Sequence, residues 1–208
     1  MAKKSKNIIF DELNQLQSLK EKFDYCNEHI GEPIENGFSR CVFEIDNKSV
    51  LKLAKSQFGK KQNENEANVK KDDENLHIFP NVTDKADDFS WIICEKVEPA
   101  TEEDFQQCLG MGFGEWSKTV RKFLSSKNII FKILGAKTKE NINELCETNE
   151  NIKEIKEFVT SHDDFAATKL FSIKNYGVAV RNKKNWIVIL YGEHFKKQGT
   201  PNFQWQKE

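Results

Sequence analysis

The feature that most restricts the fold is a pair of short β-prone runs, residues 41–45 and 49–53, which only residues 46–48 separate. Val, Ile and Phe favour strands, whereas the Asp and Asn between the runs favour a tight turn. The two runs are therefore expected to pair as the antiparallel strands of one hairpin. Residues 89–95 form a further apolar run and predict a buried strand that closes the same sheet.

Apolar residues recur at three- and four-residue intervals in three segments, which is the spacing of an amphipathic helix. We expect one helix over residues 11–30, one around residues 116–124 and one over residues 138–160. Residues 59–75 contain mostly Lys, Gln, Asn and Glu, so they are expected to form a largely exposed helix. The inward-facing row of this helix is expected to be Glu66, Ala67 and Val69.

The second half of the chain is expected to be mainly helical until a late hairpin. Thr101 precedes three acidic residues, which is typical of a helix N-cap with an acidic first turn. Residues 110–114 contain three glycines but follow a helix-like segment, so we interpret them as a connecting loop and not as a phosphate-binding loop. Two β-prone runs, residues 177–181 and 186–190, flank a polar loop at residues 182–185.

The composition is that of a globular chain, with 38% hydrophobic residues, 31% charged residues and a net charge of -1. No apolar run approaches the roughly 20 residues that a membrane helix needs, so we expect no membrane segment. The five cysteines are widely spaced without a C-x-x-C pair, which predicts free thiols in a reducing, cytoplasmic compartment. The four histidines lack metal-ligand spacing, and no G-x-S-x-G motif indicates a hydrolase. The balanced charge, with acids among the lysine pairs, does not indicate nucleic-acid binding.

Glycines precede the predicted hairpin, and a lysine lies within its second strand. Backbone N–H groups can approach phosphate oxygens at a glycine turn because no Cβ stands in the way, and a lysine on the next strand can reach the same phosphates. Gly31, Gly37 and Lys52 suit these roles. The alternative is that Lys52 is a solvent-facing lysine on an edge strand, which this pattern alone would favour.

Five short stretches occur in an informative order. They are GFSRCVF (37–43), VLKLA (50–54), QNENE (62–66), WIICEK (91–96), and NYGV (175–178) leading to YG (191–192). Together they resemble the protein-kinase-like fold, and most closely small kinase-like proteins encoded by bacteriophages, over roughly residues 31–193. An unrelated α+β domain is the alternative.

The resemblance implies an α+β fold with two lobes. Residues 1–98 would form a lobe with the opening helix, a small antiparallel sheet and the acidic helix. Residues 99–208 would form a reduced helical lobe with the late β-hairpin. The lysine-bearing hairpin and the Tyr-Gly hairpin would face each other across a shared cleft.

Carried over by position, the resemblance implies an ATP site that binds the nucleotide weakly or not at all. Its binding residues would be Gly37, Lys52, Glu66, Glu95 and Val97. Lys52 would contact the phosphates with Glu66 as its ion-pair partner, although Glu64 competes for that role. A solvated surface acid is the alternative for Glu66. Residues 95–97 would form the hinge beside the adenine.

Residues 161–165, Ser-His-Asp-Asp-Phe, are similar to the catalytic loop of kinases, in which an aspartate accepts the proton of the substrate hydroxyl. Asp164 would be this base, and Asn175 would share the metal. In kinases the asparagine follows the aspartate by five residues, where this chain has Lys169, so the match is imperfect. The alternative for Asp164 is a helix N-cap or a surface acid.

The aspartate that holds magnesium in kinases, just before Phe-Gly or Tyr-Gly, is replaced here by Leu190. An aliphatic side chain offers no oxygen to a cation that needs near-octahedral oxygen ligation, so we assign no metal ligand. Glu193 is a nearby carboxylate that could substitute, which leaves magnesium binding open. Only residues 193–208 follow, too few for the helices that seat a peptide substrate in protein kinases.

The preferred hypothesis is a catalytically impaired kinase-like protein (a pseudokinase) of phage type that acts through contacts with a host or phage protein, in the host cytoplasm. The alternative is an active minimal phosphotransferase that uses ATP to phosphorylate a small molecule or itself. Its residues would be Lys52, Asp164, Asn175 and Glu193. A third hypothesis, a nucleic-acid accessory protein, rests only on lysine pairs. The sequence leaves the partner and the oligomeric state open.

Overall fold

A computed structural model of the chain describes residues 6–69, 77–125, 136–161 and 170–190. This part of the chain forms two compact units. Unit 1 contains the described residues up to 69 together with residues 81–96, and unit 2 contains residues 77–80 and the described residues from 97 onward. Both units combine helices with antiparallel strands, which confirms the α+β fold class.

Unit 1 is built on a five-stranded antiparallel sheet with the strand order β1-β2-β3-β5-β4. Its strands are β1 (Glu35–Asn36), β2 (Arg40–Glu44), β3 (Ser49–Ala54), β4 (Val82–Lys85) and β5 (Trp91–Glu95). The predicted hairpin is confirmed as β2 and β3, whose register places Val42 opposite Lys52. The prediction that β5 closes the sheet is wrong, because β4 pairs with its outer side. Three of the four residues of β4 are exposed, so this strand lacks the apolar alternation that would have revealed it.

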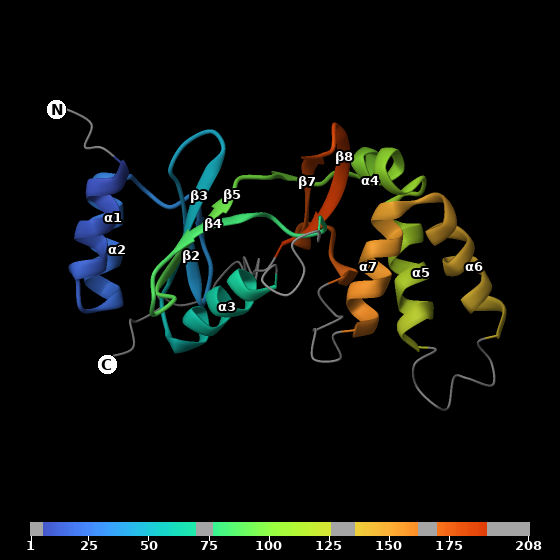
Figure 1. Cartoon of the computed structure of the whole chain (residues 1–208), viewed down its shortest axis with the longest axis horizontal. Coiled ribbons are helices and arrows are strands. Elements are labelled where there is room, and N and C mark those ends of the chain that lie inside the picture. Colours follow the sequence, from blue (N-terminus) through green and yellow to red (C-terminus); the bar gives the residue numbers. More distant parts are fainter. Residues whose placement is uncertain (1–5, 70–76, 126–135, 162–169, 191–208) are drawn as a thin grey trace, which may run out of the picture. The chain divides into compact units, whose positions relative to one another are not determined.

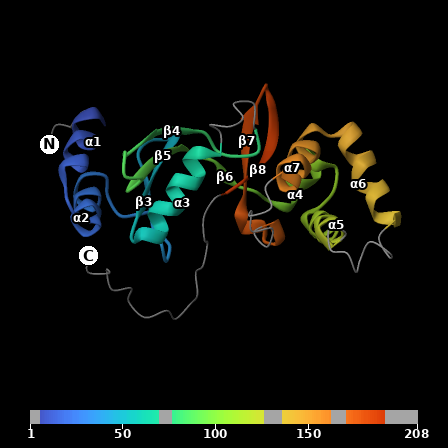
Figure 2. The ribbon, with the colours of Figure 1, turned by 60° about the horizontal axis from the view of Figure 1, so that its bottom comes forward.

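Helices cover both faces of this sheet (Figure 1, Figure 2). They are α1 (Lys6–Gln15), α2 (Leu19–His29) and α3 (Gln57–Asn68). α1 and α2 pack on one face and α3 packs on the other. The single helix predicted over residues 11–30 is wrong, because Ser18 starts a new helix there. The Ser18 hydroxyl accepts the backbone N–H of Glu21, and the Glu21 carboxylate accepts the backbone N–H of Ser18.

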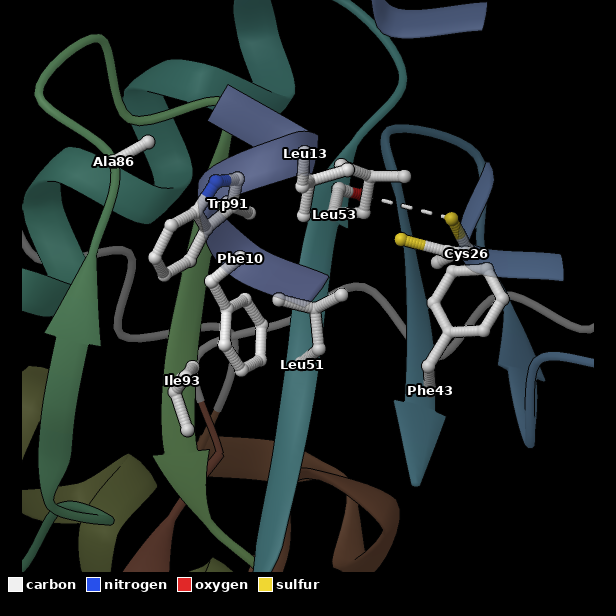
Figure 3. Packing of buried hydrophobic residues seen from close by; sticks show 10 residues of the cluster. Phe10, Leu13, Cys26, Phe43, Leu51, Leu53, Ala86, Trp91 and Ile93 are labelled. Atoms are coloured by element: carbon white, nitrogen blue, oxygen red, sulfur yellow. Dashed lines mark hydrogen bonds between the residues drawn. The ribbon is translucent and has the colours of Figure 1, made fainter. Parts of the chain in front are cut away.

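The hydrophobic core of unit 1 lies between the sheet and the two opening helices. Figure 3 shows Phe10 of α1 beside Leu51 of β3 and Ile93 of β5. Phe10 also packs against Trp91, with 5.2 Å between the two ring centroids. Because successive strand residues point to opposite faces of a sheet, Lys52 faces α3 and not this core.

Unit 2 contains four α-helices in its described part, besides a short 3-10 helix at Ile173–Asn175. They are α4 (Glu102–Leu109), α5 (Phe113–Ser125), α6 (Ala136–Thr148) and α7 (Glu150–Ser161). Thr101 caps α4 through a capping box with Asp104, as predicted, and α5 confirms the second amphipathic segment. The single helix predicted over residues 138–160 is wrong. The side-chain oxygen of Asn149 accepts the N–H of Ile152 at 3.1 Å and thereby starts α7 as a separate helix.

Unit 2 also contains an antiparallel sheet with the strand order β6-β7-β8. Its strands are β6 (Glu98–Pro99), β7 (Tyr176–Arg181) and β8 (Lys184–Ile189). β7 and β8 confirm the predicted late hairpin, but its turn has two residues and not four. Asn182 and Lys183 have positive φ angles of 49° and 65°, which the turn requires for its twist to match that of the strands.

Tyr176 of β7 is fully buried in the core of unit 2. Its ring packs edge-on against Phe105, with 5.1 Å between the ring centroids. Its hydroxyl accepts a hydrogen bond from Trp116 Nε1 at 3.1 Å and donates one to the carbonyl of Leu170 at 3.0 Å. Burial raises the pKa of Tyr176 well above its ordinary value, so the phenol keeps the proton that the second bond needs.

The sequence predicted free cysteines and no membrane helix, and both predictions concern the described residues. All five cysteines are free thiols, as predicted. No helix within the described ranges is long and apolar enough to cross a membrane.

Gly59 lies where α3 approaches the sheet most closely. A Cβ at this position would overlap the carbonyl oxygen of Ser39 and would lie 3.2 Å from the Cβ of Ala54. Neither neighbour can rotate away, because one is backbone and the other is a methyl group fixed to β3. We expect Gly59→Ala to lower the free energy of unfolding by about 2 kcal/mol, as measured by chemical denaturation.

Gly114 is the matched control, because it also lies in a helix but has nothing within 4 Å of its Cβ position. Gly114→Ala should leave stability unchanged or raise it by up to about 1 kcal/mol, since alanine favours the helix. Equal losses of stability in the two variants would contradict the close packing of α3 on the sheet.

Candidate functional site

α3 turns a polar face toward the sheet. Gln62, Asn63 and Glu66 are buried there, with relative exposures of 7%, 0% and 3%. The expected inward row is confirmed for Glu66 and for Ala67, which packs against the apolar residues of this face, whereas Val69 is half-buried at the end of the helix. A helix that buries amide and carboxylate groups needs a polar partner for each of them, and strands β2 and β3 supply several of these partners.

Glu66 lies at the centre of the site, because each of its carboxylate oxygens pairs with a different cation. The Lys52 ammonium of β3 pairs with Oε1, and Nη1 of Arg40 in β2 lies 2.8 Å from Oε2. The side chains of Lys52, Arg40 and Glu66 are 11%, 6% and 1% exposed. The structure thus brings together Lys52 and Glu66, two of the residues that the sequence singled out, and adds a third. We call these three residues the charged cluster.

Two cations of the charged cluster share its one carboxylate. Burial alone would raise the pKa of Glu66, but Lys52 and Arg40 outweigh burial and hold that pKa below its ordinary value of 4.5. Glu66 is therefore ionised at neutral pH, and an arginine keeps its proton throughout the physiological range. Two cations then face one anion in a largely buried site. Such a site suits a ligand with acceptor oxygens, because buried N–H donors need partners.

Lys52 keeps hydrogen-bond donors for such a ligand. An ammonium group has three N–H donors, and Glu66 is the one acceptor that Lys52 meets within the described part of the chain. The thiol of Cys94 lies 3.8 Å from Glu66 Oε1, and burial raises the pKa of this thiol to about 12. Cys94 is therefore neutral at physiological pH and does not change the charge of the cluster.

Residues 37–39 form the turn between β1 and β2, and polar contacts connect this turn to the neighbouring elements. Lys55 Nζ, just after β3, donates to the carbonyl of Gly37 at 3.1 Å. The hydroxyl of Ser39 donates to Gln62 Oε1 of α3 at 2.5 Å. The predicted glycine turn is thus held beside the strands that carry the charged cluster.

Three other residues that the sequence singled out are engaged in local structure. Gly31 is not part of this turn, because it follows α2 with a φ of 121° and serves to end that helix. Glu95 ends β5, and its Oε2 accepts the N–H of Asn81 at 3.2 Å. Val97 belongs to unit 2, where a Cβ on Gly177 would come within 2.7 Å of its Cγ2. The contacts of Glu95 and Val97 with adenine stay predictions.

Asn175 and Leu190 lie side by side in unit 2, since the N–H of Leu190 donates to the carbonyl of Asn175 at 2.8 Å. Leu190 has no side-chain oxygen, and no group of three or more His, Cys, Asp or Glu among the described residues could hold a metal ion. The described residues therefore do not fit a magnesium site. The other residues of the catalytic hypothesis lie outside the described residues: Asp164, Tyr191, Gly192 and Glu193.

Arg40 and Asn63 also belong to the polar contacts around Glu66, and neither was predicted as a site residue from the sequence. Arg40 Nη1 donates to Asn63 Oδ1 at 3.0 Å, and Asn63 Nδ2 donates to the carbonyl of Phe89 at 2.9 Å. A signal for Asn63 was present, because it precedes Glu66 by three residues and so shares a helix face with it. Arg40 reaches this face only through the register of β2 on β3, which puts Arg40 and Lys52 on the same side of the sheet.

The chain is only distantly similar to known proteins. No protein-family model and no curated protein matches it. Among solved structures it is similar to APH(2")-IIa in a ternary complex with streptomycin and ATP, with a TM-score of 0.36, 15% identity, and coverage of 85% of this chain and 71% of that one. It is also similar to the ADP-bound aminoglycoside phosphotransferase APH(2'')-Ib, with a TM-score of 0.35, 15% identity, and coverage of 81% and 68%. At this level neither likeness says what this chain does.

Removing the charge of Glu66 should destabilise the protein at neutral pH. Glu66→Gln removes the buried negative charge that both Lys52 and Arg40 face, so we expect the free energy of unfolding to fall by about 3 kcal/mol. The pKa of Glu66 is lowered in the folded protein, so its stabilising effect is complete above about pH 4.5 and is lost as the pH falls through the folded value. The difference between the parent and Glu66→Gln should therefore narrow below pH 4.5, as measured by urea denaturation across pH.

Glu64→Gln is the control for this experiment, because Glu64 lies in the same helix but pairs with the exposed Lys61 at 2.8 Å. Glu64→Gln should change the free energy of unfolding by no more than about 0.5 kcal/mol at every pH. A larger effect of Glu64→Gln than of Glu66→Gln would show that the wrong acid has been placed in the charged cluster.

Proposed function

We propose that this chain is a kinase-like protein that binds the phosphates of ATP through Lys52 and is impaired in phosphoryl transfer. The charged cluster is the observation that carries this proposal. In protein kinases a lysine on a strand pairs with a glutamate on a helix and contacts the nucleotide phosphates. Lys52 on β3 and Glu66 on α3 form a pair of this kind, and Lys52 retains donors for a ligand.

The chemistry around Lys52 suits a phosphate group. A phosphate brings negative charge and several acceptor oxygens, so it would satisfy the remaining N–H donors of the Lys52 ammonium. The turn at residues 37–39 adds a glycine, at which backbone N–H groups can approach phosphate oxygens closely. A neutral apolar ligand would leave these donors unsatisfied.

Phosphoryl transfer also needs ligands for a metal ion, and the described residues of this chain do not supply them. Metal ions normally bridge the β- and γ-phosphate oxygens and neutralise the charge that develops during transfer. Leu190, at the position that the sequence resemblance assigns to a metal ligand, cannot contribute an oxygen. Binding without efficient transfer suits a protein that acts through contacts with another protein. We infer a host or phage protein as that partner, in keeping with the phage-type sequence resemblance.

ATP binding tests the proposal directly. ATP at about ten times its Kd should raise the Tm of the parent chain by about 4 °C, because a ligand that binds only the folded state stabilises it. Lys52→Met should abolish this shift, and the protein should still fold because Arg40 continues to pair with Glu66. The control is Lys48→Met, which removes an exposed lysine from the turn of the same hairpin and should keep the shift. A parent chain whose melting ignores ATP contradicts the proposal.

Restoring an oxygen at position 190 should make ATP binding respond to magnesium. In Leu190→Asp the new carboxylate would lie next to Asn175, so Mg²⁺ should tighten ATP binding by about tenfold, as measured by calorimetry with and without EDTA. Leu190→Ala removes the leucine side chain without adding an oxygen and should show no such response. If the two variants respond equally to Mg²⁺, position 190 is not the missing metal ligand.

A further inference from the structure

We propose that Lys55 and Gln62 are positioning residues for phosphate binding, because they fix the turn at residues 37–39 in the chain without ligand. This inference rests on the proposed function and deepens it, since it names two residues that act on the ligand through this turn. All of the residues involved belong to unit 1.

The turn at residues 37–39 has donors for a ligand only if its backbone is held in place. The N–H groups of Gly37 and Ser39 donate to no acceptor in the described part of the chain, so both are available to phosphate oxygens. Glycine has more conformational freedom than any other residue, so a freely moving turn would have to be ordered on binding, which weakens affinity. A turn that is already fixed avoids this loss.

Lys55 directly follows β3 and holds the turn from the side of the strand. Its Nζ donates to Asn36 Oδ1 at 2.8 Å and to the carbonyl of Gly37 at 3.1 Å. Its backbone N–H donates to the carbonyl of Ser39 at 2.8 Å. Only 6% of Lys55 is exposed, so these bonds lie in surroundings of low dielectric constant, where hydrogen bonds are strong. Lys55 therefore ties both ends of the turn to the strand that carries Lys52.

Gln62 holds the same turn from the side of the helix. Its Oε1 accepts the Ser39 hydroxyl at 2.5 Å, and Ser39 and Gln62 are 2% and 7% exposed. Gln62 precedes Glu66 by four residues, so the two side chains share one face of α3. The helix also packs directly on the turn, because a Cβ at Gly59 would overlap the carbonyl oxygen of Ser39. One helix thus holds both the turn and the ion-pair partner of Lys52.

The turn and Lys52 are therefore fixed relative to each other. Lys52 pairs with Glu66 of α3, and Gln62 of the same helix pairs with the turn. A phosphate at this site would meet the Lys52 ammonium and the N–H groups of the turn in positions that are set beforehand. Neither Lys55 nor Gln62 has to touch the phosphate for this effect.

Backbone order parameters from NMR relaxation of the ligand-free chain test whether the turn is fixed. Gly37 and Ser39 should have values near about 0.85 in the parent, as in a rigid backbone, and about 0.6 or less in Lys55→Met. Lys55→Arg keeps side-chain donors and should keep the turn ordered. The control is Lys61→Met, which removes an exposed lysine next to Gln62 and should change neither value. A parent turn that is already flexible overturns the inference.

Calorimetry with ATP and the full chain tests the effect on binding. Lys55→Met and Gln62→Met should each weaken ATP binding about fivefold, and Lys55→Arg should recover most of the loss. Lys61→Met should change Kd by less than about twofold. Folded variants that bind ATP as tightly as the parent overturn the inference and leave the proposed function intact. A parent chain that binds no ATP overturns the proposed function and the inference with it.

A double-mutant cycle of Ser39→Ala and Gln62→Met separates the hydrogen bond between these residues from general structural support. Each single variant already removes the bond, so the double variant should also bind ATP about fivefold more weakly than the parent, and not about twenty-five-fold. All three should remain folded by urea denaturation. Effects that multiply in the double variant overturn the role given to this hydrogen bond. The cycle decides the role of Gln62 even if Lys55→Met does not fold.

Discussion

Unit 1 depends on one buried carboxylate. An ionised carboxylate in apolar surroundings is strongly destabilising, so α3 can bury Glu66 only where both oxygens meet donors. Lys52 and Arg40 provide these donors from adjacent strands. The position of α3 and the register of β2 on β3 are therefore coupled. A slip of one residue would turn the cation of the slipped strand to the opposite face, against the core packed beneath α1 and α2.

The two faces of the sheet differ accordingly. The face beneath α1 and α2 carries the larger hydrophobic cluster of unit 1, which Figure 3 shows. The other face has only a small apolar cluster, Val50, Ile92 and Cys94, beside the charged cluster. A buried ion network of this kind is weak evidence for stability, because hydrophobic residues in its place would often do as well. The proposed function accounts for its presence, because the remaining N–H donors of Lys52 would then meet the phosphates.

Binding and catalysis make different demands on such a site. Holding a phosphate needs positive charge and N–H donors, and both are available around Lys52. Transferring a phosphoryl group also needs a cation at the β- and γ-oxygens, and Leu190 cannot hold one. Under the proposed function, leucine at position 190 is therefore enough to keep phosphate binding and to impair phosphoryl transfer.

Much of the fold could be predicted because its signals are local. The β2–β3 hairpin and the cap at Thr101 followed from alternation, turn residues and capping preferences. The breaks at Ser18 and Asn149 also have local causes, but the apolar spacing continues across both and conceals them. β4 could not be found in this way, since its exposed residues carry no strand pattern and only its pairing with β5 defines it.

Only part of the candidate site could be predicted from the sequence. By itself the sequence determined that a lysine would lie in the second strand of a hairpin and that an acidic helix would follow, because both depend on neighbouring residues. It did not determine whether Glu64 or Glu66 meets that lysine, or that Arg40 joins them. Only the tertiary structure decided this, because burial and net charge arise when strand register and helix docking bring distant segments into contact.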